Sequence, residues 1–313
     1  GKASPLFFGC RFFTGSGTFF LLLTEFCSHL VVSQREIGLL LQIQRSGNGR
    51  PQRDGYLPQL FLILIGKPLV LHFFQMVVGT AAELADDGCN IIFADSFGHE
   101  DYMIQAAKDF PDVQFCHSTG TKAHTEGLSN YHNAFASIYE GRYLAGVAAG
   151  MKLNEMIDNG KITADQAKIG YVGAFTYAEV ISGYTSFFLG ARSVCPTATM
   201  EVTFTGSWYD ETAEKEGAQK LINNGCKLIS QHADSMGAPT ACETAGVPNV
   251  SYNGSTESVG PNTYIVSSRI DWEPYYEYAI TAAMNGEAID ADWTGTLATG
   301  SVVLTDVNTT AAA

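Results

Sequence analysis

Short apolar runs alternate with amphipathic stretches from residue 77 onwards. Runs such as Lys168–Val172 and Asn249–Tyr252 have the length of buried strands. Asp210–Asn224 carries apolar residues at helical spacing. Regular strand–helix alternation predicts an α/β fold, with parallel sheets covered by helices on both faces. The expected helices are 80–87, 101–110, 139–153, 179–192, 210–224, 237–245 and 273–284, and the expected strands are 89–93, 113–116, 168–172, 200–204, 227–230, 249–252 and 264–267.

Part of this pattern occurs twice. Leu84–Ile92 reads Leu-Ala-Asp-Asp-Gly-Cys-Asn-Ile-Ile, and Leu221–Ile229 reads Leu-Ile-Asn-Asn-Gly-Cys-Lys-Leu-Ile. Each copy ends a helix, turns at Gly-Cys, enters a strand and runs into a polar turn, at 95–98 and 232–235. Because open α/β sheets bind ligands at the carboxyl ends of their strands, the pattern predicts two lobes that clamp a ligand. Chance similarity between two helix–turn–strand units is the alternative.

In the long helix expected at 139–153, Gly141, Gly146 and Gly150 recur at spacings of four to five residues. Small residues along one face predict close packing against a sheet. Structure alone accounts for these glycines, without any functional role.

The composition limits the classes of partner. Of 313 residues, 46% are hydrophobic and 16% are charged, as in globular proteins, and the net charge is −14. Nucleic-acid binding requires clustered Lys and Arg, and so does binding to anionic lipid, so neither partner is expected.

The first quarter of the chain differs from the rest. Residues 1–76 contain seven basic and only three acidic residues. The apolar stretch Leu60–Phe74 is shorter than the roughly 20 residues of a membrane-spanning helix. Residues 6–10 faintly resemble a lipoprotein processing site, and residues 45–53 have the composition of a linker. No clear strand–helix alternation is visible in 1–76, so this segment is either an accessory segment or sequence out of register.

Motifs for metal or cofactor chemistry are not found. The seven cysteines include no C-x-x-C pair, and Cys89, Cys116 and Cys226 are expected to be core thiols. The sequence has no P-loop, no G-x-S-x-G, and no G-x-G-x-x-G that follows a strand. We therefore expect no metal, no cofactor and no catalytic residue.

Polar and aromatic residues gather where the predicted strands end. Carboxylates, amides and aromatic rings together suit a flat, hydrogen-bonding ligand such as a nucleobase. Taken singly, each aromatic residue is more often part of a core, and the histidine is more often structural than a base or metal ligand. An acid–base pair of Asp101 and Asp234 has no nucleophile beside it. The candidate ligand-binding residues are Ser96, Phe97, Asp101, Phe175, Trp208, His232, Asp234, Asn253 and Trp272.

Several of these motifs resemble the basic membrane protein family of substrate-binding lipoproteins, which includes the purine nucleoside receptor A group. The resemblance covers about residues 77–300. It rests on Ile92–Gly98, Tyr139–Gly146, Ile169–Phe175, Leu189–Val194, Gln231–Ser235, and Trp272 followed by Pro274-Tyr275-Tyr276.

The resemblance implies a type I periplasmic-binding-protein fold, with two Rossmann-like lobes joined by three hinge strands around a cleft. It also implies delivery of purine nucleosides or bases to an ABC importer. Two departures stand out. The family's first strand, ligand turn and first helix are not recognisable in 1–76, and Asn253 stands where many members have Asp.

We therefore predict an extracytoplasmic substrate-binding protein that holds an adenine- or adenosine-like ligand by lobe closure, without a chemical step. The expected lobes are 1–130 with 252–285, and 131–251 with 286–313. The expected partner is an ABC-transporter permease. We expect a monomer that meets the membrane only through a lipid anchor on the native precursor. The alternatives are a nucleoside-processing enzyme and a ligand-sensing receptor module of the same fold.

Overall fold

The computed structural model describes residues 12–14, 17–19, 22–23 and 68–312, and their side chains from Val77 onwards. It divides into two compact units. Unit 1 lies within Gly1–Phe135 and Tyr278–Trp293, and unit 2 consists of Ala136–Glu277 and Thr294–Ala313. The chain therefore passes between the units three times. These units differ from the predicted lobes at residues 131–135, 252–277 and 286–293.

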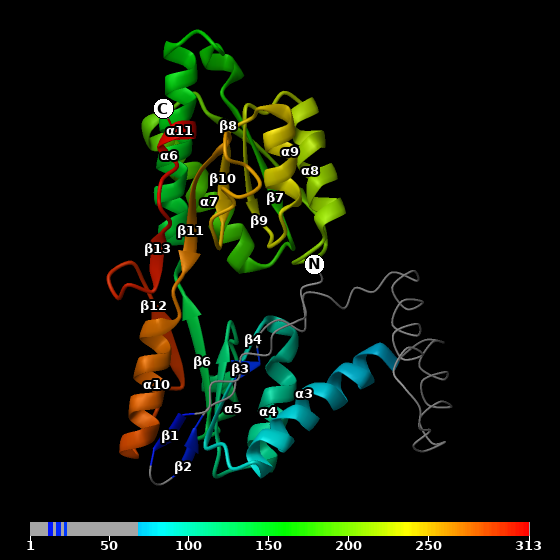
Figure 1. Cartoon of the computed structure of the whole chain (residues 1–313), viewed down its shortest axis with the longest axis vertical. Helices are drawn as coiled ribbons and strands as arrows, with labels where there is room; N and C mark the ends of the chain where they lie inside the picture. The colour runs from blue at the N-terminus through cyan, green and yellow to red at the C-terminus, as the bar shows by residue number, and fades with distance from the viewer. Residues whose placement is uncertain (1–11, 15–16, 20–21, 24–67, 313) are drawn as a thin grey trace. The chain divides into compact units, whose positions relative to one another are not determined.

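Unit 2 is built on a six-stranded sheet (Figure 1). Five of its strands run parallel, and β13 pairs antiparallel with β11 at one edge. The sheet order is β13 (Val302–Leu304), β11 (Tyr264–Ile270), β10 (Asn249–Tyr252), β9 (Leu228–His232), β7 (Lys168–Gly173) and β8 (Thr199–Phe204). The helices are α6 (Ile138–Asp158), η2 (Ala164–Gln166), α7 (Ala178–Val194), α8 (Glu211–Asn223), α9 (Gly237–Ala245) and α11 (Thr309–Ala312), and α10 (Glu273–Asn285) begins in this unit.

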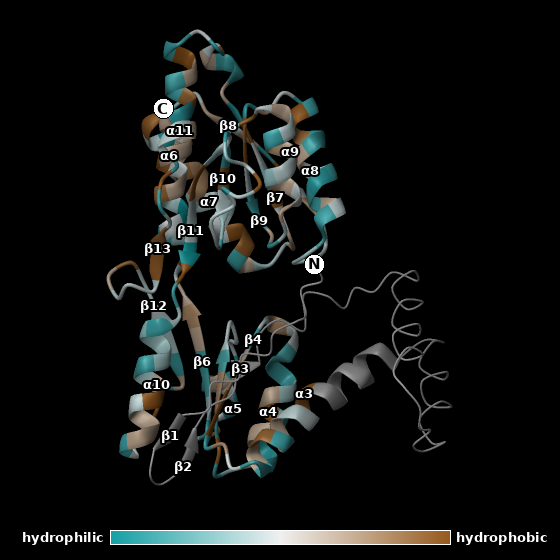
Figure 2. Ribbon diagram, in the orientation of Figure 1, coloured by the Kyte–Doolittle hydropathy of each residue, from teal (hydrophilic) through white to brown (hydrophobic). Residues whose placement is uncertain are grey.

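Helices cover both faces of this sheet because successive strand residues point to opposite sides. Tyr171 packs into the core beneath α6 and α7, whereas its neighbour Val172 packs into the core beneath α8 and α9. Likewise, Leu228 packs into the core beneath α6 and α7, and Ile229 packs into the core beneath α8 and α9. Hydrophilic residues mark the solvent side of α8 (Figure 2). The observed layers match the predicted α/β architecture.

Unit 1 contains a five-stranded sheet. Its order is β12 (Asp292–Gly295), β6 (Tyr131–Ala136), β5 (Gln114–Ser118), β4 (Ile91–Asp95) and β3 (Leu22–Leu23). The other described elements are α3 (Pro68–Asp86), η1 (Phe97–His99), α4 (Glu100–Asp109), α5 (Ala123–Glu126) and an antiparallel pair of strands, β1 (Phe12–Thr14) and β2 (Gly17–Phe19).

The first quarter of the chain contributes to this unit. The short strand β3 pairs in parallel with β4, and the helix predicted at 80–87 begins earlier, at Pro68. The lipoprotein-like segment 6–10 and the linker 45–53 lie outside the described residues.

The two long helices of unit 2, α6 and α7, approach each other closely. A Cβ on Gly146 would stand 2.0 Å from the carbonyl oxygen of Phe187, and one on Gly150 would stand 2.4 Å from that of Ala191. The glycines were expected to pack against a sheet. Only Gly141 does so, beside Ser268 of β11 and Val302 of β13, because the other two face a neighbouring helix.

Cys89, Cys116 and Cys226 are buried free thiols, as expected for core residues, and so are Cys195 and Cys242. Within residues 68–312, no helix has the length and apolar character needed to cross a membrane.

Candidate ligand-binding site

The loops after three neighbouring strands of unit 2 are joined by backbone hydrogen bonds. The N–H of Ala174, after β7, donates to the carbonyl of His232 at 3.0 Å. The N–H of Gly206, after β8, donates to Ala174 at 2.8 Å, and the N–H of Asp234 donates to Trp208 at 2.8 Å. The carboxyl ends of β7, β8 and β9 therefore form one continuous surface, where parallel sheets present ligand-binding groups.

Three aromatic side chains lie together on this surface. The rings of Phe175 and Tyr177 are stacked, with centroids 4.9 Å apart and an angle of 14°. The ring of Trp208 meets that of Phe175 edge-on at 5.4 Å and lies 6.1 Å from that of Tyr177. Phe175 and Trp208 are half-buried, and Tyr177 is 45% exposed. We call these three residues the aromatic cluster. Its rings reach solvent, unlike rings packed in a core.

His232, the last residue of β9, lies beneath the cluster and is fully buried. Its Nε2 lies 2.7 Å from Oε1 of Glu179, at the start of α7. Its Nδ1 has no hydrogen-bond partner, and a Cβ on Gly183 would stand only 2.6 Å from it. This arrangement places a proton on Nε2, which donates to Glu179, and leaves neither ring nitrogen facing solvent.

Tyr252, at the end of β10, extends this stack inwards. Its ring lies 4.0 Å from that of His232, and its hydroxyl lies 3.5 Å from Glu179. Burial, and next the charge of Glu179, raise the pKa of the Tyr252 phenol well above its usual value. Tyr252 is therefore a neutral donor at physiological pH.

Arg142 of α6 lies at the deep end of the stack and is fully buried. Its guanidinium donates to the carbonyl of Ser251 at 2.8 Å, and to the hydroxyls of Ser268 and Ser230 at 3.2 and 2.5 Å. Three rings surround the charge at 4.8 to 5.8 Å, those of Tyr171, Phe187 and Tyr252. Hydrogen bonds and aromatic faces thus stabilise a cation that has no ion pair in the described part of the molecule.

The remaining predicted residues of unit 2 also follow its strands. Asp234 is exposed on the β9 loop. Asn253, directly after β10, is exposed and has a φ of 63°, in the left-handed region that few non-glycine residues adopt. Trp272, after β11, is half-buried, and its carbonyl accepts the N–H groups of Tyr275 and Tyr276 at the start of α10.

A buried carboxyl group connects two of the ligand-site loops. Glu214 of α8 is fully buried, and its Oε1 accepts the N–H of Asp210 at 3.2 Å. Both of its oxygens lie 3.2 Å from the N–H of Ser235, next to Asp234. Burial raises the pKa of Glu214 to about 7 against the opposing effect of these hydrogen bonds.

In unit 1, two predicted residues follow β4. Ser96 has a φ of 75° and is half-buried, and the half-buried ring of Phe97 lies 6.1 Å from that of Phe135. Thr119, after the neighbouring strand β5, also has a positive φ, of 69°. Such backbone conformations are concentrated at binding sites, and here both end strands of one parallel pair.

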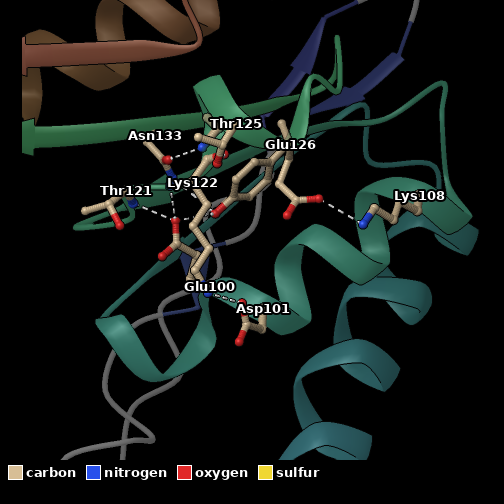
Figure 3. A network of polar contacts seen from close by, with 10 residues as sticks. Glu100, Asp101, Lys108, Thr121, Lys122, Thr125, Glu126 and Asn133 are labelled. Carbon is tan, nitrogen blue, oxygen red and sulfur yellow. Dashed lines mark hydrogen bonds and ion pairs between the residues drawn. The ribbon is translucent and has the colours of Figure 1, made fainter.

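Asp101, also in unit 1, is paired with a lysine. It lies in the first turn of α4, its side chain is 73% exposed, and it forms an ion pair with Lys122 (Figure 3). Its neighbour Glu100 is the buried carboxylate of this region. One oxygen of Glu100 accepts the N–H groups of Thr121 at 2.5 Å and Lys122 at 2.7 Å, which fixes the loop after β5 (Figure 3).

The structure thus brings Phe175, Trp208 and His232 together in unit 2, with Asp234 attached through the Trp208 carbonyl. Ser96 and Phe97 lie in unit 1, where Asp101 is paired to Lys122. Tyr177, Glu179 and Glu214 also belong to this site but are not among the residues predicted from the sequence. Glu214 was detectable, because with Ala218 and Leu221 it occupies the buried i, i+4, i+7 stripe of α8.

The chain belongs to the family of PnrA-like ABC transporter substrate-binding proteins, whose family model matches residues 71–311. It is 36% identical to a putative ABC transporter glucose-binding protein of Haloferax volcanii, over 68% of this chain and 51% of that protein. It is 34% identical to a purine-binding protein of Brucella abortus, over 65% of this chain and 54% of that protein. The chain spans about half the length of these two relatives.

The fold is shared with solved solute-binding proteins. An ABC transporter solute-binding protein of Conexibacter woesei superimposes with a TM-score of 0.61 at 21% identity, over 77% of this chain and 76% of that one. The predicted type I periplasmic-binding-protein fold is confirmed.

Proposed function

We propose that this protein binds a purine base or nucleoside, of the adenine or adenosine type, and delivers it to the permease of an ABC importer. Family membership supports the transport role, and the purine-binding relative from Brucella supports the ligand class. The aromatic cluster at the strand ends of unit 2 is the observation that carries the proposal.

The chemistry of the cluster suits a flat ligand. A purine ring stacked on an exposed aromatic face gains roughly 1–3 kcal/mol. Tyr177 and Trp208 offer such faces, and the carboxylate of Asp234 is exposed on the adjoining loop to accept a ring or amino N–H. The fixed positions of the joined loops lower the entropy lost when a ligand is bound.

Binding without turnover is favoured over a nucleoside-processing enzyme by the surroundings of His232. A general base must reach the proton that it removes. One ring nitrogen of His232 is bonded to Glu179, and the other is packed against Gly183. His232 therefore supports the cluster from below and does not meet a substrate in this arrangement.

We further propose an extracytoplasmic location, a lipid anchor on the native precursor, and a monomeric protein that closes its lobes on the ligand and is then recognised by the permease. A sensory role would use the same binding site but pass the signal to a different partner. Pull-down of the cognate permease, with ligand present and absent, separates the two roles: capture of a signalling protein in place of a permease contradicts the importer role.

The decisive experiment measures binding by isothermal calorimetry and thermal shift with adenine, adenosine, guanosine and glucose. Adenine or adenosine is expected to bind and to raise the melting temperature. Glucose is included because of the Haloferax relative, and binding of glucose alone would overturn the purine assignment. Chromatography of the adenosine sample tests for turnover, and release of free adenine would identify an enzyme.

A further inference from the structure

Two loops of the candidate site are held through one internal carboxyl group. The turn after β8 carries Trp208 and ends at Asp210, whose N–H donates to Glu214. The turn after β9 carries Asp234 and continues to Ser235, whose N–H also donates to Glu214. Glu214 is fully buried, so these bonds do not compete with water.

Other contacts make this junction tight. The Asp210 carboxylate caps α8 by accepting the N–H of Ala213 at 2.9 Å. The Ser235 hydroxyl accepts the N–H of Gly237 at 3.1 Å, at the start of α9. A Cβ on Gly237 would stand 2.2 Å from the carbonyl oxygen of Glu211, so the first turns of α8 and α9 are in direct contact. Neither turn can shift without disturbing the Glu214 carboxyl group.

The groups around Glu214 are mainly uncharged. Asp210, on the preceding loop, is an acid whose negative charge raises the pKa of Glu214. The β9 loop presents Ser235, and α9 begins with Gly237 and Ala238. The apolar core that α8 shares with α9 and the sheet contains Val172 and Ile229. Within α8, the neighbouring charged residues Glu211, Lys215 and Glu216 are exposed.

We infer that Glu214 is a positioning residue of the ligand-binding site: its neutral carboxyl group holds the Trp208 turn and the Asp234 turn in one arrangement, and its ionisation loosens both turns together. The holding role follows from the contacts alone, whereas its effect on purine affinity rests on the proposed function.

The direction of the pH effect follows from linkage. In the closed arrangement the pKa of Glu214 is about 7, and when the turns open, water restores the ordinary value of about 4.5. Between pH 4.5 and pH 7, opening of the two turns therefore releases a proton from Glu214. Within that interval the opening equilibrium rises by up to about tenfold per pH unit, and it levels off above pH ~7.

Hydrogen exchange measured by mass spectrometry tests this without any ligand. Exchange rates of peptides containing Asp210 and Ser235, corrected for intrinsic exchange, give the opening equilibrium at pH 5, 6 and 7. Protection of both peptides is expected to fall at least tenfold from pH 5 to 7 in the unaltered protein. Peptides from β11 provide the reference for global opening.

Two variants complete the test. Glu214→Gln keeps the shape but cannot ionise, so its protection is expected to be independent of pH once intrinsic exchange is removed. Glu216→Gln removes the same charge from an exposed position of the same helix and is expected to retain the fall. The inference is overturned if protection in the unaltered protein does not change with pH, or if protection falls equally in Glu214→Gln. The first of these outcomes is measured on the unaltered protein alone, so it does not depend on whether a variant folds.

The ligand measurement is separate. With adenine as probe, the Kd is expected to rise at least fivefold from pH 5 to 8 in the unaltered protein and to stay constant in Glu214→Gln. If adenine binds at no pH, the proposed function fails while the exchange data still decide the role of Glu214. If adenine binds equally well at both pH values despite the exchange profile, the turns do not control affinity.

Discussion

Gly88 and Gly225 adopt nearly the same left-handed backbone, with φ of 86° and 88°, at equivalent points of the two repeated segments. After them, the N–H of Cys89 donates to Leu84 at 3.0 Å, and the N–H of Cys226 donates to Leu221 at 3.1 Å. Both helices therefore end in a Schellman motif that leads directly into a parallel strand. This shared geometry explains why glycine recurs at the same point of both segments.

The first prediction concerns these helix ends. Gly225→Ala forces a Cβ into the left-handed region and is expected to lower the free energy of unfolding by about 1 kcal/mol. Gly217→Ala is the matched control in α8, because a Cβ there meets Thr203 at an ordinary 3.4 Å. It is expected to stabilise by up to ~1 kcal/mol, since alanine is the better helix former. Urea denaturation measures the free energy of unfolding of both variants. Equal changes in the two would contradict the requirement for glycine at position 225.

The second prediction concerns the aromatic cluster. Trp208→Ala removes the ring that touches both Phe175 and Tyr177, and it is expected to weaken purine binding at least tenfold, or about 1.4 kcal/mol. Tyr143→Ala removes a ring that is 39% exposed on α6 and is expected to leave the Kd unchanged. Calorimetry distinguishes the two variants. Unchanged affinity in Trp208→Ala would assign this ring to packing alone.

The third prediction concerns the support of His232. Because a Cβ on Gly183 would stand 2.6 Å from Nδ1 of His232, Gly183→Ala is expected to displace the ring from Tyr252 and Glu179. The cost to stability is expected to be about 1–3 kcal/mol, as for other overpacked sites, together with weaker purine binding. Thr185→Ala, at an exposed position of α7, is the control. Thermal melting and calorimetry on both variants check this, and a variant with normal stability and affinity would exclude the contact.

The fourth prediction concerns acid sensitivity of unit 1. His117, on β5, is fully buried, and neither ring nitrogen makes a hydrogen bond of standard geometry. Burial, and next the charge of His99, lower the pKa of His117 to about 3, although the nearby backbone of Ser96 opposes the shift. The unfolded chain binds the proton near pH 6.5, so stability is full above this value and is lost as the pH falls towards 3.

His117→Leu is expected to reduce this acid dependence, because leucine has no group that can be protonated. The substitution also removes no hydrogen bond of standard geometry. His124→Gln is the control, since His124 is 61% exposed and its ion pair with Asp292 contributes little. Denaturation at pH 4 and 7 measures the difference. An unaltered pH slope in His117→Leu would show that other groups cause the acid sensitivity.

Periodicity in the sequence predicted the longer strands and helices of unit 2, but not its short elements η2, β13 and α11. It missed β6, whose sequence Tyr-His-Asn-Ala-Phe-Ala places two polar residues in the core. Contacts remote in sequence make those residues acceptable: His132 meets Gln114 at 2.8 Å, and Asn133 accepts the N–H of Ala123 at 2.7 Å. A strand that depends on such partners has no local signature.

The candidate site was predictable in its location but not in its internal support. Strand ends indicated Phe175 and Trp208, whose rings meet in the structure. Tyr177 and Glu179 lie beyond the strand end, in a loop and a helix start, where the sequence offers no periodic signal. The local pattern also could not show that Lys122 would pair with Asp101, because that contact joins the first turn of α4 to the loop after β5, 21 residues further along the chain.

Arg142 has a consequence for how the polypeptide is made. Its guanidinium, near the start of unit 2, needs oxygen atoms from Ser230, Ser251 and Ser268, which the ribosome adds much later. Until Ser268 has been synthesised, the guanidinium of Arg142 lacks one of its hydrogen-bond acceptors and stays hydrated. Chains that end before Ser268 are therefore expected to remain protease-sensitive in unit 2, because the core around Arg142 cannot be completed without that residue.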